Sequence, residues 1–183
     1  MGPFRRALLL DRDGVINHDF GHVGSTENFL FIDGIFELVR TANEFNWVTI
    51  VVTNQSGIGR GYYTEDQFLK LTDWMLTRFS SEGCLVEKVY WCPFHPEHGV
   101  GQYKLHSFER KPNPGLIFRA RDEMKLDLAD SILVGDKDSD MIAGKSAGVG
   151  CLIQVLGSYD ASDSANVYVE NLQDILPYLS TSK

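Results

Sequence analysis

Residues 7–14 read ALLLDRDG: four apolar residues run directly into two aspartates that flank an arginine. A short apolar run bounded by polar residues is typical of a strand buried on both faces, as in a parallel sheet. Ligands of such sheets bind beyond the carboxyl ends of the strands. Asp11 and Asp13 come at that end of this strand, so the pair is expected to face a binding crevice.

Apolar runs and amphipathic stretches alternate along the rest of the chain. Runs of β-branched and apolar residues predict further strands at 48–52, 86–91, 131–134 and 151–156. Apolar residues at helical spacing predict helices at 35–45, 65–81, 114–124, 138–147 and 171–179. This alternation is typical of an α/β fold, a doubly wound, Rossmann-like parallel sheet with helices on both faces. Residues 1–183 are expected to form a single domain.

Charge and composition exclude several classes of protein. Asp and Glu number 25 against 17 Lys and Arg, and the net charge of −8 argues against binding nucleic acid or docking on an anionic membrane. No apolar run approaches the roughly 20 residues that span a bilayer, and the run at 7–10 is too short for a signal peptide. The cysteines, Cys84, Cys92 and Cys151, are scattered and odd in number, which fits the reducing cytoplasm.

Polar segments follow two more of the predicted strands. TNQSG at 53–57 follows the strand at 48–52, and GDKD at 135–138 follows the strand at 131–134. Since the carboxyl ends of parallel strands meet at one edge of the sheet, Asp11, Asp13, Thr53 and Asp136 are expected around one crevice. Carboxylates this close repel one another, and Mg2+, which prefers carboxylate oxygens, relieves the repulsion. Asp11 and Asp136 are the side chains expected to bind it.

A metal beside carboxylates and lysines is suited to a phosphate dianion. Backbone N–H groups of the turn at 54–57 would donate hydrogen bonds, and Lys111 and Lys137 would neutralise the remaining charge. One aspartate can attack phosphorus to form an acyl-phosphate, while another protonates the leaving oxygen and then activates water. Each segment alone also fits a plain turn or a helix cap. Their order, with Arg110-Lys111-Pro112 between the last two, favours the phosphate site.

These segments together resemble the haloacid dehalogenase superfamily of aspartyl phosphatases. LLLDRDG, Thr53, Lys111 and GDKDSD at 135–140 stand where that superfamily has its four motifs. A closer resemblance, to the heptose bisphosphate phosphatases and next to the related histidinol-phosphatases, extends over essentially the whole chain. Its stretches are DRDGVIN at 11–17, NFLFIDG at 28–34, VVTNQSGIGRG at 51–61, CPFHP at 92–96, RKPNPG at 110–115 and VGDKDSDM at 134–141.

The resemblance implies a role for each matching residue. Asp11 is expected to be the nucleophile and a Mg2+ ligand, and Asp13 the general acid/base with its backbone carbonyl on the metal. Thr53 and Lys111 would hold the transferring phosphoryl group, and Asp136 would be the third metal ligand. The expected substrate contacts are Asp19, Phe20, Gly21, His22, Asn54, Gln55, Ser56, Arg110 and Lys137.

The resemblance also implies an activity and its surroundings. The chain is expected to be a phosphatase acting on a small sugar bisphosphate, releasing the 7-phosphate of a heptose 1,7-bisphosphate during nucleotide-activated heptose synthesis. Loops 17–34 and 92–113 would serve the substrate side in place of a large cap domain, which is consistent with a monomer. Alternatives are a histidinol-phosphate phosphatase, a DNA-end phosphatase, which the net charge disfavours, and a non-catalytic sugar-phosphate-binding module.

The segment before Arg110 departs from the family pattern. Many relatives hold a structural zinc there with a Cys-x-His pair and a Cys-x-Cys pair, whereas this chain has Cys92-Pro93-Phe94 and Ser107-Phe108-Glu109. Structural zinc is therefore not expected. His95, His98, His106 and Glu109 could join Cys92 in a rearranged site, but their spacing matches no common tetrahedral pattern, and solvated loop histidines are favoured.

Overall fold

β1, Ala7–Leu10, is an interior strand of a six-stranded parallel sheet in the computed structural model, which describes residues 4–180. The strand order is β3-β2-β1-β4-β5-β6, and every neighbouring pair is parallel. The other strands are β2 Val48–Asn54, β3 Lys88–Cys92, β4 Ile132–Gly135, β5 Cys151–Val155 and β6 Val167–Val169. Residues 1–3 and 181–183 of the predicted domain lie outside the described range.

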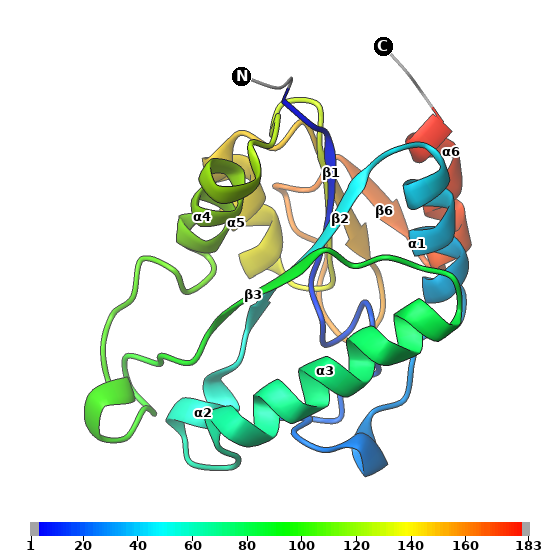
Figure 1. Ribbon diagram of the computed structural model, residues 1–183. Helices are drawn as coiled ribbons and strands as arrows, with labels where there is room; N and C mark the ends of the chain where they lie inside the picture. Colours follow the sequence, from blue (N-terminus) through cyan, green and yellow to red (C-terminus); the bar gives the residue numbers. More distant parts are fainter. Residues whose placement is uncertain (1–3, 181–183) are drawn as a thin grey trace.

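Helices cover both faces of this sheet (Figure 1). The α-helices are α1 Ile35–Glu44, α2 Ser56–Gly59, α3 Glu65–Ser81, α4 Gly115–Met124, α5 Asp138–Ala147 and α6 Leu176–Ser180, with short 3-10 helices at Thr26–Asn28, Gly101–Tyr103 and Leu172–Ile175. In Figure 1, α4 and α5 lie to the left of β1, and α1 and α6 lie to the right. None of the helices within residues 4–180 is long and apolar enough to cross a membrane.

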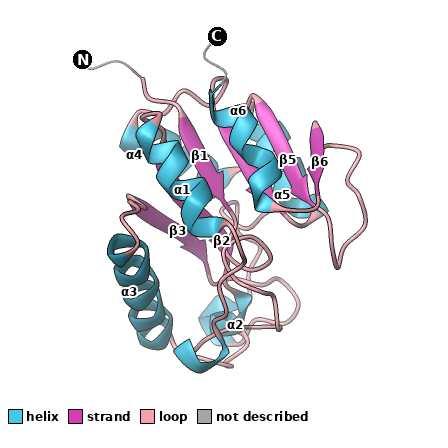
Figure 2. Ribbon diagram, turned by 90° about the vertical axis from the view of Figure 1, so that its right-hand side faces the viewer, coloured by secondary structure: helices cyan, strands magenta, loops and turns pink. Residues whose placement is uncertain are grey.

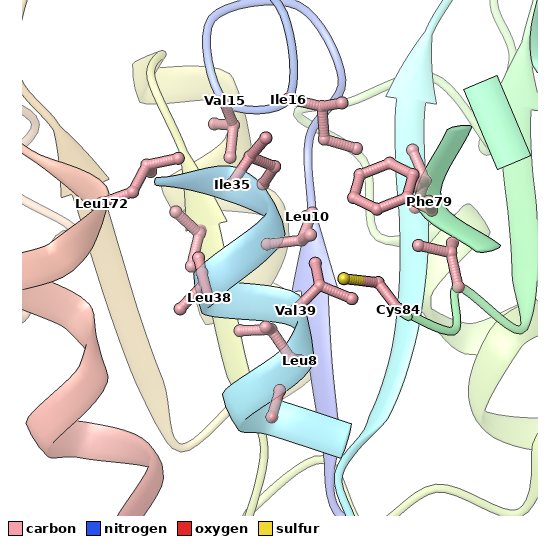
Figure 3. Packing of buried hydrophobic residues seen from close by; sticks show 14 of the residues in the cluster. Leu8, Leu10, Val15, Ile16, Ile35, Leu38, Val39, Phe79, Cys84 and Leu172 are labelled. Carbon is pink, nitrogen blue, oxygen red and sulfur yellow. The ribbon is translucent and has the colours of Figure 1, made fainter. Parts of the chain in front are cut away.

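The side chains of β1 alternate between the two layers. All four residues are fully buried; Leu8 and Leu10 join the cluster that includes α1, and Ala7 and Leu9 join the cluster that includes α4 and α5. In Figure 3, Leu8 and Leu10 face the side chains that α1 presents. A strand buried on both sides needs apolar residues at every position, which explains its unbroken apolar run.

The α/β prediction is confirmed, and the predicted strands and longer helices lie close to the predicted positions. One strand, β6, and one α-helix, α2, were not predicted, nor were the 3-10 helices at Thr26–Asn28 and Gly101–Tyr103. β6 is a three-residue edge strand, too short for its apolar run to be distinctive. α2 has four residues, too few to show helical periodicity.

Loops at the carboxyl edge of the sheet carry the predicted site, and they gather around α2 and the start of α3 (Figure 2). The chain leaves β1 through a tight turn that requires glycine. Gly14 has φ 94°, and a Cβ there would lie 2.1 Å from Asp136 Oδ2. Gly14 thus lets the loop after β1 approach the loop after β4 closely.

Candidate active site

A cleft of about 560 Å3 opens at the carboxyl edge of the sheet. Its lining is Asp11, Asp13, Asp19, Gly21, His22, Asn54, Gln55, Ser56, Tyr63, Arg110, Lys111, Pro112, Lys137, Ser139, Asp140 and Tyr159. The fold therefore brings nearly all predicted site residues together. The exceptions are Thr53, Phe20 and Asp136, which do not line the cleft.

Three buried carboxylates meet at the inner end of the site. Asp11, Asp136 and Asp140 each have an oxygen within 4.8 Å of the others, and Asp136 Oδ1 is buried with no hydrogen-bond partner. Burial, followed by the charge of Asp11, raises the pKa of Asp136 to about 8, and burial also raises the pKa of Asp140. The cluster carries more negative charge than its surroundings satisfy, which is the property of a cation site.

Asp140 was not assigned a role from the sequence, although it ends the GDKDSD segment. It lies in the first turn of α5, where its Oδ2 accepts a hydrogen bond from Lys137 N at 3.1 Å. The signal was its place as the last aspartate of the GDKDSD segment at 135–140, which the family resemblance assigns to the site.

Lys111 is the cation of this cluster. Its ammonium is almost fully buried and lies 2.8 Å from Asp11 Oδ1 and 2.6 Å from Asp140 Oδ1, and it also donates to Val52 O at 2.8 Å. Burial alone would lower the pKa of Lys111, but the charges of the two carboxylates outweigh this and raise it to about 12. Lys111 is therefore positively charged at neutral pH.

Asn54 fixes the backbone of Lys111. The Asn54 amide donates to Lys111 O and accepts from Lys111 N, both at 3.0 Å, and so ties the end of β2 to the segment before α4. The predicted substrate contact thus has a clear positioning function, and it also lines the cleft.

Asp13 is held by three donors, of which the sequence had singled out only Gln55, as a substrate contact. Arg12 donates to both of its carboxylate oxygens at 2.8–3.2 Å, and Asn17 Nδ2 and Gln55 Nε2 donate at 3.0 and 2.9 Å. Arg12 itself is 1% exposed and lies 5.9 Å from each of the rings of Phe29 and Phe68. A buried guanidinium between two rings keeps the Asp13 side chain in one orientation.

Thr53 reaches the site through Gln55. The hydroxyl of Thr53 is buried and accepts from Gln55 Nε2 at 3.0 Å, while Tyr63 OH donates to Gln55 Oε1 at 2.6 Å. Gln55 is thereby oriented with its amide nitrogen toward Asp13. Tyr63 lies two residues beyond the matching stretch at 51–61, and the structure places it in this network and on the wall of the cleft.

The outer part of the cleft contains a second polar cluster. Lys137 Nζ lies 3.0 Å from Asp19 Oδ2, and Tyr159 OH donates to the same oxygen at 3.2 Å. Burial would raise the pKa of Asp19, but the hydrogen bond and charge of Lys137 outweigh it and leave the pKa lowered. Phe20, predicted to contact substrate, instead points elsewhere: it is 63% exposed and stacks on His18.

Arg110 lines the cleft from the loop that precedes α4. Its Nη1 donates to Phe94 O at 3.2 Å, and burial lowers its pKa slightly from the usual arginine value without removing the charge. Within residues 4–180 no carboxylate forms an ion pair with Arg110, so its charge is available to an anionic ligand.

The loop at 92–113 is held by packing and backbone hydrogen bonds. Phe94 packs against the α4–α5 core, and its ring centroid is 6.1 Å from that of Tyr103, while Phe108 is 62% exposed. Cys92 is buried, and burial raises the pKa of its thiol. His95 Nδ1 accepts hydrogen bonds from the backbone N–H groups of residues 97 and 98.

Comparisons with known proteins agree with this geometry. Residues 108–181 match the family model described as "HAD-hyrolase-like". The chain is 53% identical over 178 residues to D-glycero-alpha-D-manno-heptose-1,7-bisphosphate 7-phosphatase of Burkholderia mallei, covering 96% of this chain and 94% of that protein. It is 42% identical to the D-glycero-beta-D-manno-heptose-1,7-bisphosphate 7-phosphatase of Vibrio cholerae, over 94% of this chain and 95% of the other.

Solved structures show the same fold. A HAD-like phosphatase of Mesorhizobium loti matches with a TM-score of 0.87 and 34% identity, over 97% of this chain and 87% of the other. A D,D-heptose 1,7-bisphosphate phosphatase of B. bronchiseptica, complexed with magnesium and phosphate, matches with a TM-score of 0.79 and 24% identity, over 95% and 97%. From the sequence identity across nearly its whole length, the chain belongs to the haloacid dehalogenase superfamily and, within it, to the family of the heptose-1,7-bisphosphate 7-phosphatases.

Proposed function

We propose that the chain is a Mg2+-dependent phosphatase that releases the 7-phosphate of D-glycero-D-manno-heptose 1,7-bisphosphate, with Asp11 as the nucleophile. The observation that carries the proposal is the placement of Asp11 between a buried ammonium and two more buried carboxylates at the inner end of the cleft. Two relatives, 53% and 42% identical over nearly the whole chain, are named for heptose 1,7-bisphosphate, which supports the same substrate here. The product would feed nucleotide-activated heptose synthesis.

The carboxylate cluster fits a magnesium ion. Asp136 Oδ1 lacks any hydrogen-bond partner, and the oxygens of Asp11, Asp136 and Asp140 lie close enough together to bind one cation. Carboxylate oxygens are hard donors that suit Mg2+, and protein Mg2+ sites with few carboxylates also use phosphate oxygens. Mg2+ bound there would neutralise the carboxylates and the charge that develops on the phosphoryl oxygens.

In the first step an oxygen of the Asp11 carboxylate forms a bond to phosphorus, and the bond from phosphorus to the C7 oxygen breaks. Protonated Asp13 gives its proton to that leaving oxygen, so the dephosphorylated sugar departs as an alcohol. Lys111, whose Nζ lies 2.8 Å from Asp11 Oδ1, would stabilise the equatorial phosphoryl oxygens. Arg12, Asn17 and Gln55 keep the carboxylate of Asp13 directed for this transfer.

In the second step Asp13 accepts a proton from water, and the water oxygen bonds to phosphorus. The bond between phosphorus and Asp11 breaks, releasing inorganic phosphate and restoring the Asp11 carboxylate. The same residue therefore acts as acid and then as base, as microscopic reversibility requires.

Arg110 supports a bisphosphate over histidinol phosphate. Its guanidinium lacks a carboxylate partner among the described residues and can take the non-reacting phosphate in a bidentate manner. Histidinol phosphate offers an ammonium group in place of a second phosphate, and Arg110 would repel it. We further propose a preference for the α anomer, because a relative named for it is 53% identical, whereas relatives named for the β anomer are 38–44% identical.

A phosphate-release assay tests the proposal. Heptose 1,7-bisphosphate of both anomers, histidinol phosphate and a 5′-phosphorylated oligonucleotide would be compared at one Mg2+ concentration. We expect the α bisphosphate to give the highest kcat/KM and only its C7 phosphate to be lost. A higher kcat/KM with histidinol phosphate or the oligonucleotide contradicts the proposed substrate. Absence of turnover with tight bisphosphate binding would favour a binding module.

The proposed enzyme is one domain over the whole chain. The cysteines at 84, 92 and 151 are free thiols, which supports placing the enzyme in the reducing cytoplasm.

A further inference from the structure

Tyr159 reaches the cleft from the loop that joins β5 to β6, a segment that matches none of the family motifs. Its phenol donates to Asp19 Oδ2 at 3.2 Å, and its ring centroid lies 4.7 Å from the ammonium of Lys137. The side chain is 42% exposed, so it borders both the cleft and solvent. No residue of this loop was predicted to belong to the site.

The loop is tied to the segment that carries the metal-binding cluster. Gln154 is fully buried, and its Nε2 donates to Asp136 O at 3.1 Å and to Asp160 O at 2.9 Å. Its Oε1 accepts from Ser162 N at 2.7 Å, and the hydroxyl of Ser162 donates to Asp138 Oδ1. A side chain on a loop fixed at this many points keeps its position when a ligand arrives.

Tyr159 has hydrogen-bonding capacity left after its contact with Asp19. A phenol has one O–H donor and oxygen lone pairs that can accept. The donor is used by Asp19, so the oxygen can accept a hydrogen bond from a ligand hydroxyl. Burial raises the pKa of Tyr159, so the phenol is neutral at physiological pH and keeps both functions.

The position of Tyr159 corresponds to the leaving group and not to the reacting phosphate. On the proposed function the phosphoryl group is transferred to Asp11, beside Lys111, whereas Tyr159 contacts Asp19 and Lys137. Lys137 Nζ also lies 3.5 Å from Asp136 Oδ2, so this outer cluster borders the reacting centre. On the proposed function, the part of the substrate between its two phosphates is a chain of hydroxyl-bearing carbons. A phenol whose O–H is donated to a carboxylate can still accept a hydrogen bond from a substrate hydroxyl group.

We propose that Tyr159 is a specificity-determining residue that accepts a hydrogen bond from a hydroxyl of the substrate's polyol part while its ring holds Lys137 in place. The inference rests on the proposed function for the identity of the polyol. A site built to bond a hydroxyl discriminates through that bond, so the phenol oxygen selects polyol phosphates over phosphates that lack hydroxyls.

The test is Tyr159→Phe, which removes the phenol oxygen and keeps the ring over Lys137. Steady-state kinetics would compare heptose 1,7-bisphosphate with p-nitrophenyl phosphate, which has no hydroxyl to bond. We expect kcat/KM for the bisphosphate to fall about five- to tenfold, mainly through a higher KM, since this is the usual effect of one lost hydrogen bond. The aryl phosphate should change less than about twofold by the same reasoning.

The matched control is Tyr168→Phe. Tyr168 OH donates to Ser162 O of the same loop at 2.8 Å, but Tyr168 does not line the cleft. We expect this variant to leave both substrates unchanged. The proposal is overturned if Tyr159→Phe slows both substrates equally, if it slows neither, or if the Tyr168 variant reproduces its effect, which would assign the loss to a loosened loop.

The proposed function can fail separately from this inference. If the wild-type protein prefers a phosphorylated polyol other than the heptose bisphosphate, the proposed substrate is wrong, and the same ratio measured with the preferred polyol decides the role of Tyr159. A wild-type protein that hydrolyses the aryl phosphate but no polyol phosphate overturns both.

Discussion

Lys111 is the residue on which the inner site depends most. Its ammonium is buried between Asp11 and Asp140, and it also donates a hydrogen bond to Val52 O in β2. Removing a buried cation leaves its carboxylates desolvated and unpaired, which costs more than the pair contributed. The same residue is proposed to stabilise the phosphoryl group, so the effects of its loss on stability and on turnover must be measured separately.

Lys111→Met keeps the length of the side chain and removes the charge. We expect the free energy of unfolding without Mg2+ to fall by about 3–5 kcal/mol, because a buried ion pair loses one partner. Urea denaturation measures this. Lys88→Met is the control, since Lys88 pairs with Glu123 at the surface and should change stability little. A Lys111 variant as stable as the Lys88 variant would contradict the buried network.

Residue roles could be predicted where polar side chains end an apolar run, as for Asp11 and Asp13, or where a segment resembles a family motif, as for Lys111. The structure brings these three residues into one cleft. The parts played by Arg12 and Tyr63 could not be found in either way, because the burial of Arg12 and the hydrogen bond from Tyr63 to Gln55 depend on how the loops pack. The three-dimensional contacts, and not the residue types, reveal these partners.

Among the elements, the loop at 92–113 connects β3 to α4 and carries Arg110. Phe94 attaches this loop to the core, and its carbonyl accepts the hydrogen bond from Arg110. Phe94 supplies the apolar contact that holds the loop, whereas Phe108 is exposed. The position of Arg110 therefore depends on the packing of Phe94.

Phe94→Ala should loosen the loop. We expect it to lower the free energy of unfolding by about 1–2 kcal/mol, because a half-buried aromatic ring is removed, and to raise KM for a bisphosphate more than it lowers kcat. Urea denaturation and steady-state kinetics check the two effects. Phe108→Ala removes an exposed ring from the same loop and serves as the control. Equal effects from the two variants would show that Phe94 does not anchor Arg110.

The same loop is predicted to hold no structural zinc. Three of the positions where relatives have ligands are Phe94, Ser107 and Glu109, and a single thiolate cannot build a closed tetrahedral shell. Burial raises the pKa of Cys92, which further disfavours the thiolate. Elemental analysis of protein purified without added metal should find no stoichiometric zinc. One zinc per chain that disappears with Cys92→Ser would contradict this and support the histidine-rich alternative.

Helices and strands could be predicted best where their pattern of apolar residues is long. α3 has a capping box at Thr64 and seventeen residues of helical spacing, and β1 has an unbroken buried run. β6 is a three-residue edge strand that pairs only with β5, so its formation depends on the rest of the sheet. Short elements of this kind owe their structure to tertiary contacts and carry no sequence signal of their own.

At the scale of the whole molecule, the fold concentrates negative charge at one edge of the sheet. The net charge is −8, and the loops after β1 and β4 bring Asp11, Asp136 and Asp140 together. The doubly wound topology could be predicted, because alternating strands and helices allow few arrangements. The repulsion between Asp11 and Asp136 could be predicted too, whereas the part of Asp140 in the cluster and the burial of all three carboxylates could not.

Mg2+ should stabilise the protein in a pH-dependent manner. The pKa of Asp136 is raised to about 8 in the folded protein, so folding favours the protonated carboxyl. The contribution of this group to the free energy of unfolding is therefore largest at acidic pH and is lost as pH rises to about 8. Mg2+ competes with those protons and should contribute about 2.7 kcal/mol at a hundredfold excess over Kd. The rise in Tm on adding Mg2+ should therefore be larger at about pH 8.5 than at about pH 6. An equal or smaller rise at the higher pH would contradict the site.

The central claim is that Asp11 carries the phosphoryl group taken from C7 of the sugar. Its most direct test is a rapid acid-quenched single turnover of heptose 1,7-bisphosphate by the wild-type protein, followed by mass spectrometry of the peptide that contains residues 11–13. We predict phosphate on Asp11, a sugar product that keeps its C1 phosphate, and no phosphorylated peptide from the Asp11→Asn variant. Phosphate released without modification of Asp11, or a sugar product that keeps its C7 phosphate, would contradict the account.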